Sequence, residues 1–83
     1  MKKDKIVKIQ WEDTSSNSGW RDRKFLKEWA RKNTMCESVG FLVAKNKRNV
    51  ILAAMKDMDK RFTDYNDYHK IPRRCIKNIK ILK

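Results

Sequence analysis

Apolar and polar side chains alternate along residues 6–12, with Val7, Ile9 and Trp11 on one face and mostly polar residues on the other. A period of two is typical of a strand that is buried on one side only. Residues 13–19 then form a polar stretch rich in Ser, Asn and Asp, residue types that bond their own backbone in turns. The pattern therefore predicts a half-buried strand followed by a loop.

Two further apolar segments lie in the middle of the chain, over residues 36–45 and 50–55. The polar residues 45–49 separate them, which favours a hairpin with a turn at this point. Gly40 interrupts the first segment, and glycine inside a strand indicates a sharp bend or a close approach of another backbone.

A helix is predicted over residues 20–32, because four apolar side chains in it recur at helical spacing. These are Phe25, Leu26, Trp29 and Ala30. Ser18 is the expected N-cap, and Asp22 suits the first turn of the helix. We expect the apolar face of the helix to pack on the sheet.

The last third of the chain begins with a mixed-charge loop over residues 56–67. A short strand over residues 68–71 follows. Pro72 cannot donate a hydrogen bond to a sheet, and it is well placed to begin a single helical turn through residues 73–75. Residues 76–82 form the last predicted strand.

Together these elements predict one α+β domain over residues 1–83, a small five-stranded antiparallel β-barrel with one helix inserted after the first strand. Pairing of the last strand with the first would close the barrel and remove its exposed edges. The predicted core consists of Val7, Ile9, Trp11, Phe25, Leu26, Trp29, Val39, Phe41, Val43, Leu52, Ala54, Ile71, Ile76, Ile79 and Ile81.

The net charge of the chain indicates the sign of the charge on its partner. The chain has 22 Lys and Arg against 10 Asp and Glu, a formal net charge of +12, while 40% of it is hydrophobic. A compact domain with such a field attracts anionic partners. The sequence contains no run of about 18 apolar residues and no signal-peptide pattern, so we expect no membrane partner and a cytosolic location.

Four short motifs lie along the chain: Trp11-x-Asp13, Gly19-Trp20, Ser38-Val39-Gly40-Phe41-Leu42 and Ile71-Pro72-x-x-x-Ile76-x-x-Ile79. Together they resemble a group of small proteins encoded by bacterial viruses and prophages, with a pattern similar to Sm-like β-barrels. The resemblance implies an Sm-like barrel in which a proline-led turn precedes the last strand. It also implies a phage accessory protein in the bacterial host cytosol, acting in counter-defence or host takeover.

Aromatic and basic residues are mixed in or beside the predicted loops. These are Trp20, Arg21, Arg23, Arg61, Tyr65, Tyr68, Arg73 and Arg74. Binders of nucleotides need cations for phosphate and flat faces for bases, and guanidinium serves both purposes. The alternative is that Trp20 packs as an anchor at the start of the helix, that the tyrosines lean on the barrel, and that the arginines are simply solvated.

The outer face of the predicted helix is basic. Lys24, Lys27 and Arg31 form one stripe, with Arg21 just before it. Such a stripe could follow a phosphate backbone, or it could be a solvated face. A membrane-surface role is disfavoured, because a short helix would use its apolar face to cover the barrel.

The sequence contains no catalytic motif, and we predict that the protein is not an enzyme and needs no cofactor. His69 is the only histidine, and we expect it to be structural. Cys36 and Cys75 are expected to be reduced core residues, since their spacing does not fit a zinc site. Four aspartates in or beside the 56–67 loop are expected to balance nearby cations; they are Asp57, Asp59, Asp64 and Asp67.

The sequence thus favours a non-enzymatic protein that binds an anionic ligand, either a nucleic acid or a signalling nucleotide. The alternative is a protein-binding inhibitor of a host defence complex or a complex that handles nucleic acid. The choice between DNA and RNA stays open, as does the possibility of a homo-oligomer.

Overall fold

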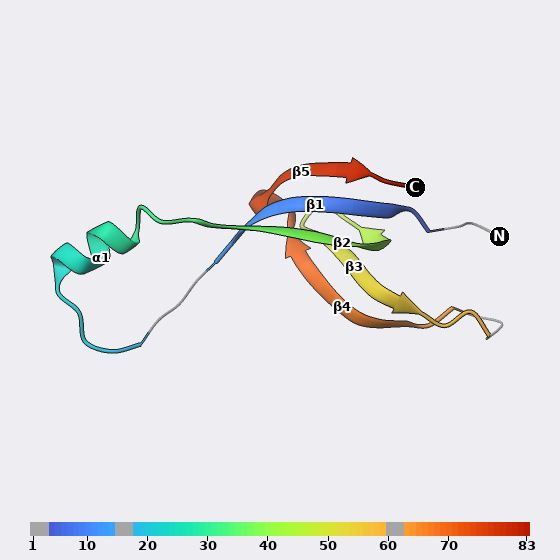
Figure 1. Ribbon diagram of the computed structural model, residues 1–83, viewed down its shortest axis with the longest axis horizontal. Coiled ribbons are helices and arrows are strands. Elements are labelled where there is room, and N and C mark those ends of the chain that lie inside the picture. Colours follow the sequence, from blue (N-terminus) through green and yellow to red (C-terminus); the bar gives the residue numbers. More distant parts are fainter. Residues whose placement is uncertain (1–3, 15–17, 60–62) are drawn as a thin grey trace.

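The computed structural model describes residues 4–14, 18–59 and 63–83 of the chain (Figure 1). The elements along the chain are β1 (Ile6–Asp13), α1 (Arg23–Trp29), β2 (Thr34–Lys45), β3 (Asn49–Lys56), β4 (Tyr65–Pro72), the single-turn helix η1 (Arg73–Cys75) and β5 (Ile76–Ile81). The predicted α+β class, with five antiparallel strands and one α-helix, is confirmed.

The five strands form one antiparallel sheet with the order β4-β3-β2-β1-β5. The predicted hairpin is the β2–β3 pair, and the predicted pairing of the last strand with the first is the β1–β5 pair. The predicted closure into a barrel is not observed, because the described residues of β4 and β5 do not pair with each other. The sheet is therefore open, with β4 and β5 as its edges.

Although the sheet is open, it is strongly curled. The rings of Trp11 on β1 and His69 on β4 have their centroids 6.3 Å apart, although β2 and β3 lie between these strands. Neighbouring strands are spaced about 4.8 Å apart, so a flat sheet would separate β1 from β4 by about 14 Å. The curl makes one face of the sheet concave.

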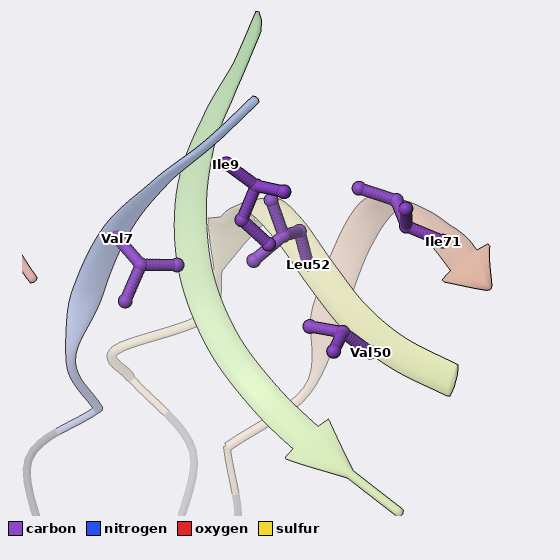
Figure 2. Close-up of a cluster of buried hydrophobic side chains, with 5 residues drawn as sticks. All are labelled: Val7, Ile9, Val50, Leu52 and Ile71. Carbon is purple, nitrogen blue, oxygen red and sulfur yellow. The ribbon is translucent and has the colours of Figure 1, made fainter. Parts of the chain in front are cut away.

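The hydrophobic core lies on this concave face. Its five fully buried members come from β1, β3 and β4, and Figure 2 shows their side chains: Val7, Ile9, Val50, Leu52 and Ile71. Trp11, Leu42 and Ile76 pack against them. Full burial of an aliphatic side chain of this size contributes about 1.5–3 kcal/mol, so this small cluster carries much of the stability of the fold.

Several residues predicted to lie in the core are exposed. Phe25 and Leu26 on α1 are 41% and 48% exposed, because the helix lies away from the sheet. Val39 is paired with Lys8 on the convex face, and Ile79 and Ile81 lie on β5, which has a neighbour on one side only. Four further members of the predicted core are also not fully buried: Trp29, Phe41 and Val43 are half-buried, and Ala54 is exposed.

The helix α1 is shorter than predicted and is capped at a different residue. Its N-cap is Asp22, whose carboxylate accepts a hydrogen bond of 2.9 Å from the backbone N–H of Phe25, and Ser18 lies outside the helix. No residue of α1 is buried. Figure 1 shows the helix at one end of the molecule, beyond the sheet, so the predicted packing of its apolar face on the sheet is wrong.

The helix is carried by an arm, which we define as residues 12–14 and 18–35. β1 and β2 continue to pair there, with Glu12 opposite Met35 and Asp13 opposite Thr34, whereas the ladder of β5 ends at Trp11. The arm makes the molecule long, with extents of 56 × 24 × 20 Å and a Cα radius of gyration of 16.7 Å. A compact domain of this length would have a radius of gyration of about 12 Å.

Gly40 lies at a close approach of two backbones, as predicted. A Cβ atom at this position would be 2.7 Å from the carbonyl oxygen of Ala53 on β3. Shortly after it, the register of the β2–β3 ladder shifts between Leu42 and Ala44. This irregularity bends β2 and helps the sheet to curl.

Candidate anion-binding site

The turn between β2 and β3 is held in shape by one asparagine. The side-chain oxygen of Asn46 accepts hydrogen bonds of 2.8 Å from the backbone N–H groups of Arg48 and Asn49. The backbone N–H of Asn46 donates to the carbonyl of Asn49 at 2.9 Å. Asparagine favours such turns because its short side chain reaches its own backbone. Lys47 and Arg48 are thereby fixed at the tip of the turn, with exposed side chains.

The helical turn η1 lies directly against this β2–β3 turn. The backbone N–H of Arg73 donates to the carbonyl of Arg48 at 2.8 Å, and the guanidinium of Arg73 donates to the carbonyl of Asn46 at 3.0 Å. Pro72 places η1 here, since it is the last residue of β4 and pairs with Asn49, the first residue of β3.

These contacts assemble four exposed cations, which we call the turn cluster: Lys47, Arg48, Arg73 and Arg74. A surface hollow of about 490 Å³ lies among them, lined by Lys47, Arg48, Asn49, Pro72 and Arg74. Across the described part of the chain, no carboxylate forms an ion pair with any of the four. The hollow therefore has a positive potential, and its arginines can bind phosphate with two parallel hydrogen bonds.

A second group of cations lies on the arm. Residues 20–32 contain six Lys and Arg against two acidic residues, Asp22 and Glu28. The predicted stripe is shorter than expected, because α1 ends at Trp29 and only Lys24 and Lys27 lie within the helix. Arg31 lies beyond it, with its guanidinium 3.7 Å from the carboxylate of Glu28, an exposed pair that stabilises little.

Trp20 lies just before α1 and is 99% exposed. Its backbone carbonyl accepts a hydrogen bond of 3.1 Å from the guanidinium of Arg21, which also lies 5.1 Å from the centre of the Phe25 ring. The interpretation of Trp20 as a packed anchor at the start of the helix is therefore wrong.

Other predicted binding residues do not join either group. The hydroxyl of Tyr65 donates to the carboxylate of Asp4 at 2.6 Å, and this hydrogen bond raises the pKa of Tyr65. Tyr65 thus ties the segment before β1 to β4. Tyr68 is exposed on β4 opposite Ala53, several residues before η1. Arg61 lies outside the described residues.

The described residues of the mixed-charge 56–67 segment include a local hydrogen bond between a side chain and the backbone. The carboxylate of Asp57 accepts a hydrogen bond of 2.8 Å from the backbone N–H of Asp59. In the described parts of the chain, no three His, Cys, Asp or Glu side chains gather closely enough to hold a metal ion. Cys36 and Cys75 are unpaired and half-buried rather than part of the buried core.

The structure brings Arg73 and Arg74 together with Lys47 and Arg48. From the sequence, Lys47 and Arg48 were predicted only to be part of a turn. Their place beside Arg73 and Arg74 follows from the register of β3 with β4, which the sequence pattern does not give. Once β3 pairs with β4, its first residue must lie opposite Pro72, and the turn before β3 then lies beside the residues that follow Pro72.

Comparison of the chain with models of protein families, with curated proteins and with solved structures finds no match. Within residues 4–14, 18–59 and 63–83, no helix has both the length and the apolar character that a membrane crossing requires.

Proposed function

We propose that this protein is a non-enzymatic nucleic-acid-binding protein and that the turn cluster binds the phosphate backbone. The observation that carries this proposal is the cluster itself. Its four cations are exposed, three of them line one hollow, and hydrogen bonds of the backbone and of Asn46 fix the elements that carry them. A preformed set of cations without carboxylates is suited to an anion that carries several charges.

A polymer fits this site better than a small signalling nucleotide. Among the described residues, those that line the hollow include no aromatic ring to offer a bound base a flat face to stack on. The hollow thus offers contacts to phosphate alone. A nucleic acid can add further phosphate contacts along the molecule, whereas a single nucleotide cannot.

The Sm-like scaffold and a phage accessory role in counter-defence are part of the same proposal. The curled five-stranded sheet and the proline-led turn before β5 support the scaffold. A protein-binding inhibitor of a host complex is the second candidate, and the observation that favours it is the uncovered apolar face of α1, with Phe25 and Leu26.

The test is to measure binding of fluorescently labelled oligonucleotides by anisotropy over a series of salt concentrations. The site variant combines Lys47→Ala, Arg48→Ala and Arg74→Ala, and it keeps Arg73 because that side chain holds the turn. The control variant removes three exposed lysines near the chain termini, which lie at the other end of the sheet in Figure 1: Lys5, Lys80 and Lys83. Both variants lose the same net charge.

We expect the site variant to bind at least about ten-fold more weakly than the wild type and the control variant to bind almost normally. Each lost phosphate contact lowers the slope of log K against log salt by about 0.7–0.9, so the site variant should lose about 2 to 3 in slope. Equal losses of affinity in both variants would show that binding depends on the overall positive potential of the protein and not on the turn cluster. Absence of binding by the wild type at low salt would refute the proposal.

A further inference from the structure

The arm presents aromatic and aliphatic side chains that no other part of the described chain covers. Trp20 is 99% exposed, and Phe25 and Leu26 on the adjoining helix are 41% and 48% exposed. Large apolar side chains that stay exposed within one short segment indicate contact with a partner. The arm is also too far from the core for these side chains to contribute to folding, since α1 has no buried residue.

The same short segment is strongly basic, and its two acidic residues are already engaged. Asp22 caps the helix and Glu28 pairs with Arg31. Five cations of the segment form no ion pair with any described carboxylate: Arg21, Arg23, Lys24, Lys27 and Lys32. The partner of the arm must therefore combine negative charge with flat apolar faces. Single-stranded nucleic acid has this composition, because its phosphates are regularly spaced and its bases are unpaired.

The arm and the turn cluster lie at the same end of the sheet. The helical turn η1 leads directly into β5, whose first residue, Ile76, is paired with Trp11 at the base of the arm. Figure 1 shows α1 projecting from this end of the sheet. One strand of nucleic acid can thus contact the turn cluster and continue along the arm.

Building on the proposed function, we infer that the arm selects single-stranded over duplex nucleic acid, with Trp20 stacking on an unpaired base and the cations of the arm contacting its phosphates. In a duplex each base already stacks on its neighbours, so an exposed indole gains nothing there.

The test compares a labelled oligothymidylate of about 20 nucleotides with a duplex of the same length, for the wild type and for Trp20→Ala. We expect the wild type to bind the single strand at least about ten-fold more tightly than the duplex. Trp20→Ala should lose about ten-fold on the single strand and nothing on the duplex, because stacking on an aromatic side chain is the contact that is removed. Trp20→Phe should retain part of the affinity.

The matched control is Met58→Ala, which removes another exposed apolar side chain, 76% exposed, from the segment that follows β3. The C-terminal end of β3 lies at the opposite end of the molecule from α1 in Figure 1. Met58→Ala should bind both probes like the wild type. Since Trp20 makes no side-chain contact that supports the fold, Trp20→Ala should keep the circular dichroism spectrum of the wild type, and a change in affinity cannot then be ascribed to unfolding.

The outcomes separate this inference from the proposed function. If the turn-cluster variant binds weakly but Trp20→Ala binds the single strand like the wild type, the inference is wrong and the proposed function stands. Equal affinity of the wild type for the single strand and the duplex also overturns the inference alone. If the wild type binds neither probe, both fail. A complex with a protein from nuclease-treated lysate that Trp20→Ala abolishes, with oligonucleotide affinity unchanged, would assign the arm to a protein partner instead.

Discussion

Two residue-level contacts hold the curl of the sheet. Gly40 allows the backbones of β2 and β3 to approach closely, since a Cβ atom there would be 2.7 Å from the carbonyl oxygen of Ala53. At the C-terminal end of β3, the carboxylate of Asp4 accepts a hydrogen bond of 2.6 Å from the hydroxyl of Tyr65 and lies 3.7 Å from the ammonium of Lys56. The first contact is steric and lies between two neighbouring strands. The second is electrostatic and connects the segment before β1 to β3 and β4, which a flat sheet would keep farther apart.

Replacing Gly40 by alanine should destabilise the protein by about 1–3 kcal/mol, because a backbone oxygen cannot move aside as a flexible side chain can. In an ordinary strand the same substitution is stabilising by about 0.5–1 kcal/mol. A loss of stability would therefore distinguish the close approach at Gly40 from an ordinary strand position. Urea unfolding followed by circular dichroism measures it. Val39→Ala, on the convex face, is the control and should cost less. A Gly40→Ala protein at least as stable as the wild type would show that β2 and β3 do not approach this closely.

Among the elements, α1 depends on local interactions alone. None of its residues is buried, and a helix of seven residues is marginal in water without tertiary support. What remains is the cap by Asp22, the contact of Arg21 with Phe25 and the weak pair of Glu28 with Arg31. The helix should therefore unfold locally without the sheet.

Asp22→Ala should consequently reduce the helicity of α1 and leave global stability almost unchanged. Loss of an N-cap costs about 0.5–2 kcal/mol, which is enough to melt an isolated helix of this length. Backbone chemical shifts in NMR would show the loss of helix over residues 23–29, while amide exchange in β1 to β3 stays slow. Asp59→Ala, which changes an exposed carboxylate outside the helix, is the control. A large fall in the urea midpoint for Asp22→Ala would mean that α1 is coupled to the sheet.

The elements also show which parts of the fold could be predicted from the sequence. The strands and the turn after Pro72 depend on local signals, namely a period of two and the fixed φ of proline. Their predicted ranges are close to those observed except for β4, which begins at Tyr65, inside the predicted 56–67 loop, rather than at Tyr68. The position of α1 could not be predicted in this way, because an apolar helix face does not specify what covers it. Closure of the sheet and assembly of the turn cluster depend on strand register, which is a non-local property.

At the scale of the whole molecule, the arm decides the shape. The Cα radius of gyration of 16.7 Å exceeds the value of about 12 Å for a compact domain of this length. Two features keep the arm extended. Residues 20–32 have four more cations than carboxylates, and the rest of the chain is also basic, so the two parts repel each other. The pairing of β1 with β2 also continues into the base of the arm and directs it away from the sheet.

Small-angle X-ray scattering can test this shape directly, on a monomer and with extrapolation to zero concentration. We expect a radius of gyration close to that of the extended molecule, and we expect it to change little when salt is raised, because the β1–β2 pairing and not repulsion alone sets the direction of the arm. A value near 12 Å at low salt would contradict the extended arm. A fall toward 12 Å only at high salt would show that charge alone keeps the arm out. In either case the protein itself would cover Phe25 and Leu26. The inferred stacking of Trp20 on a base would then require a new measurement of the solvent exposure of its indole.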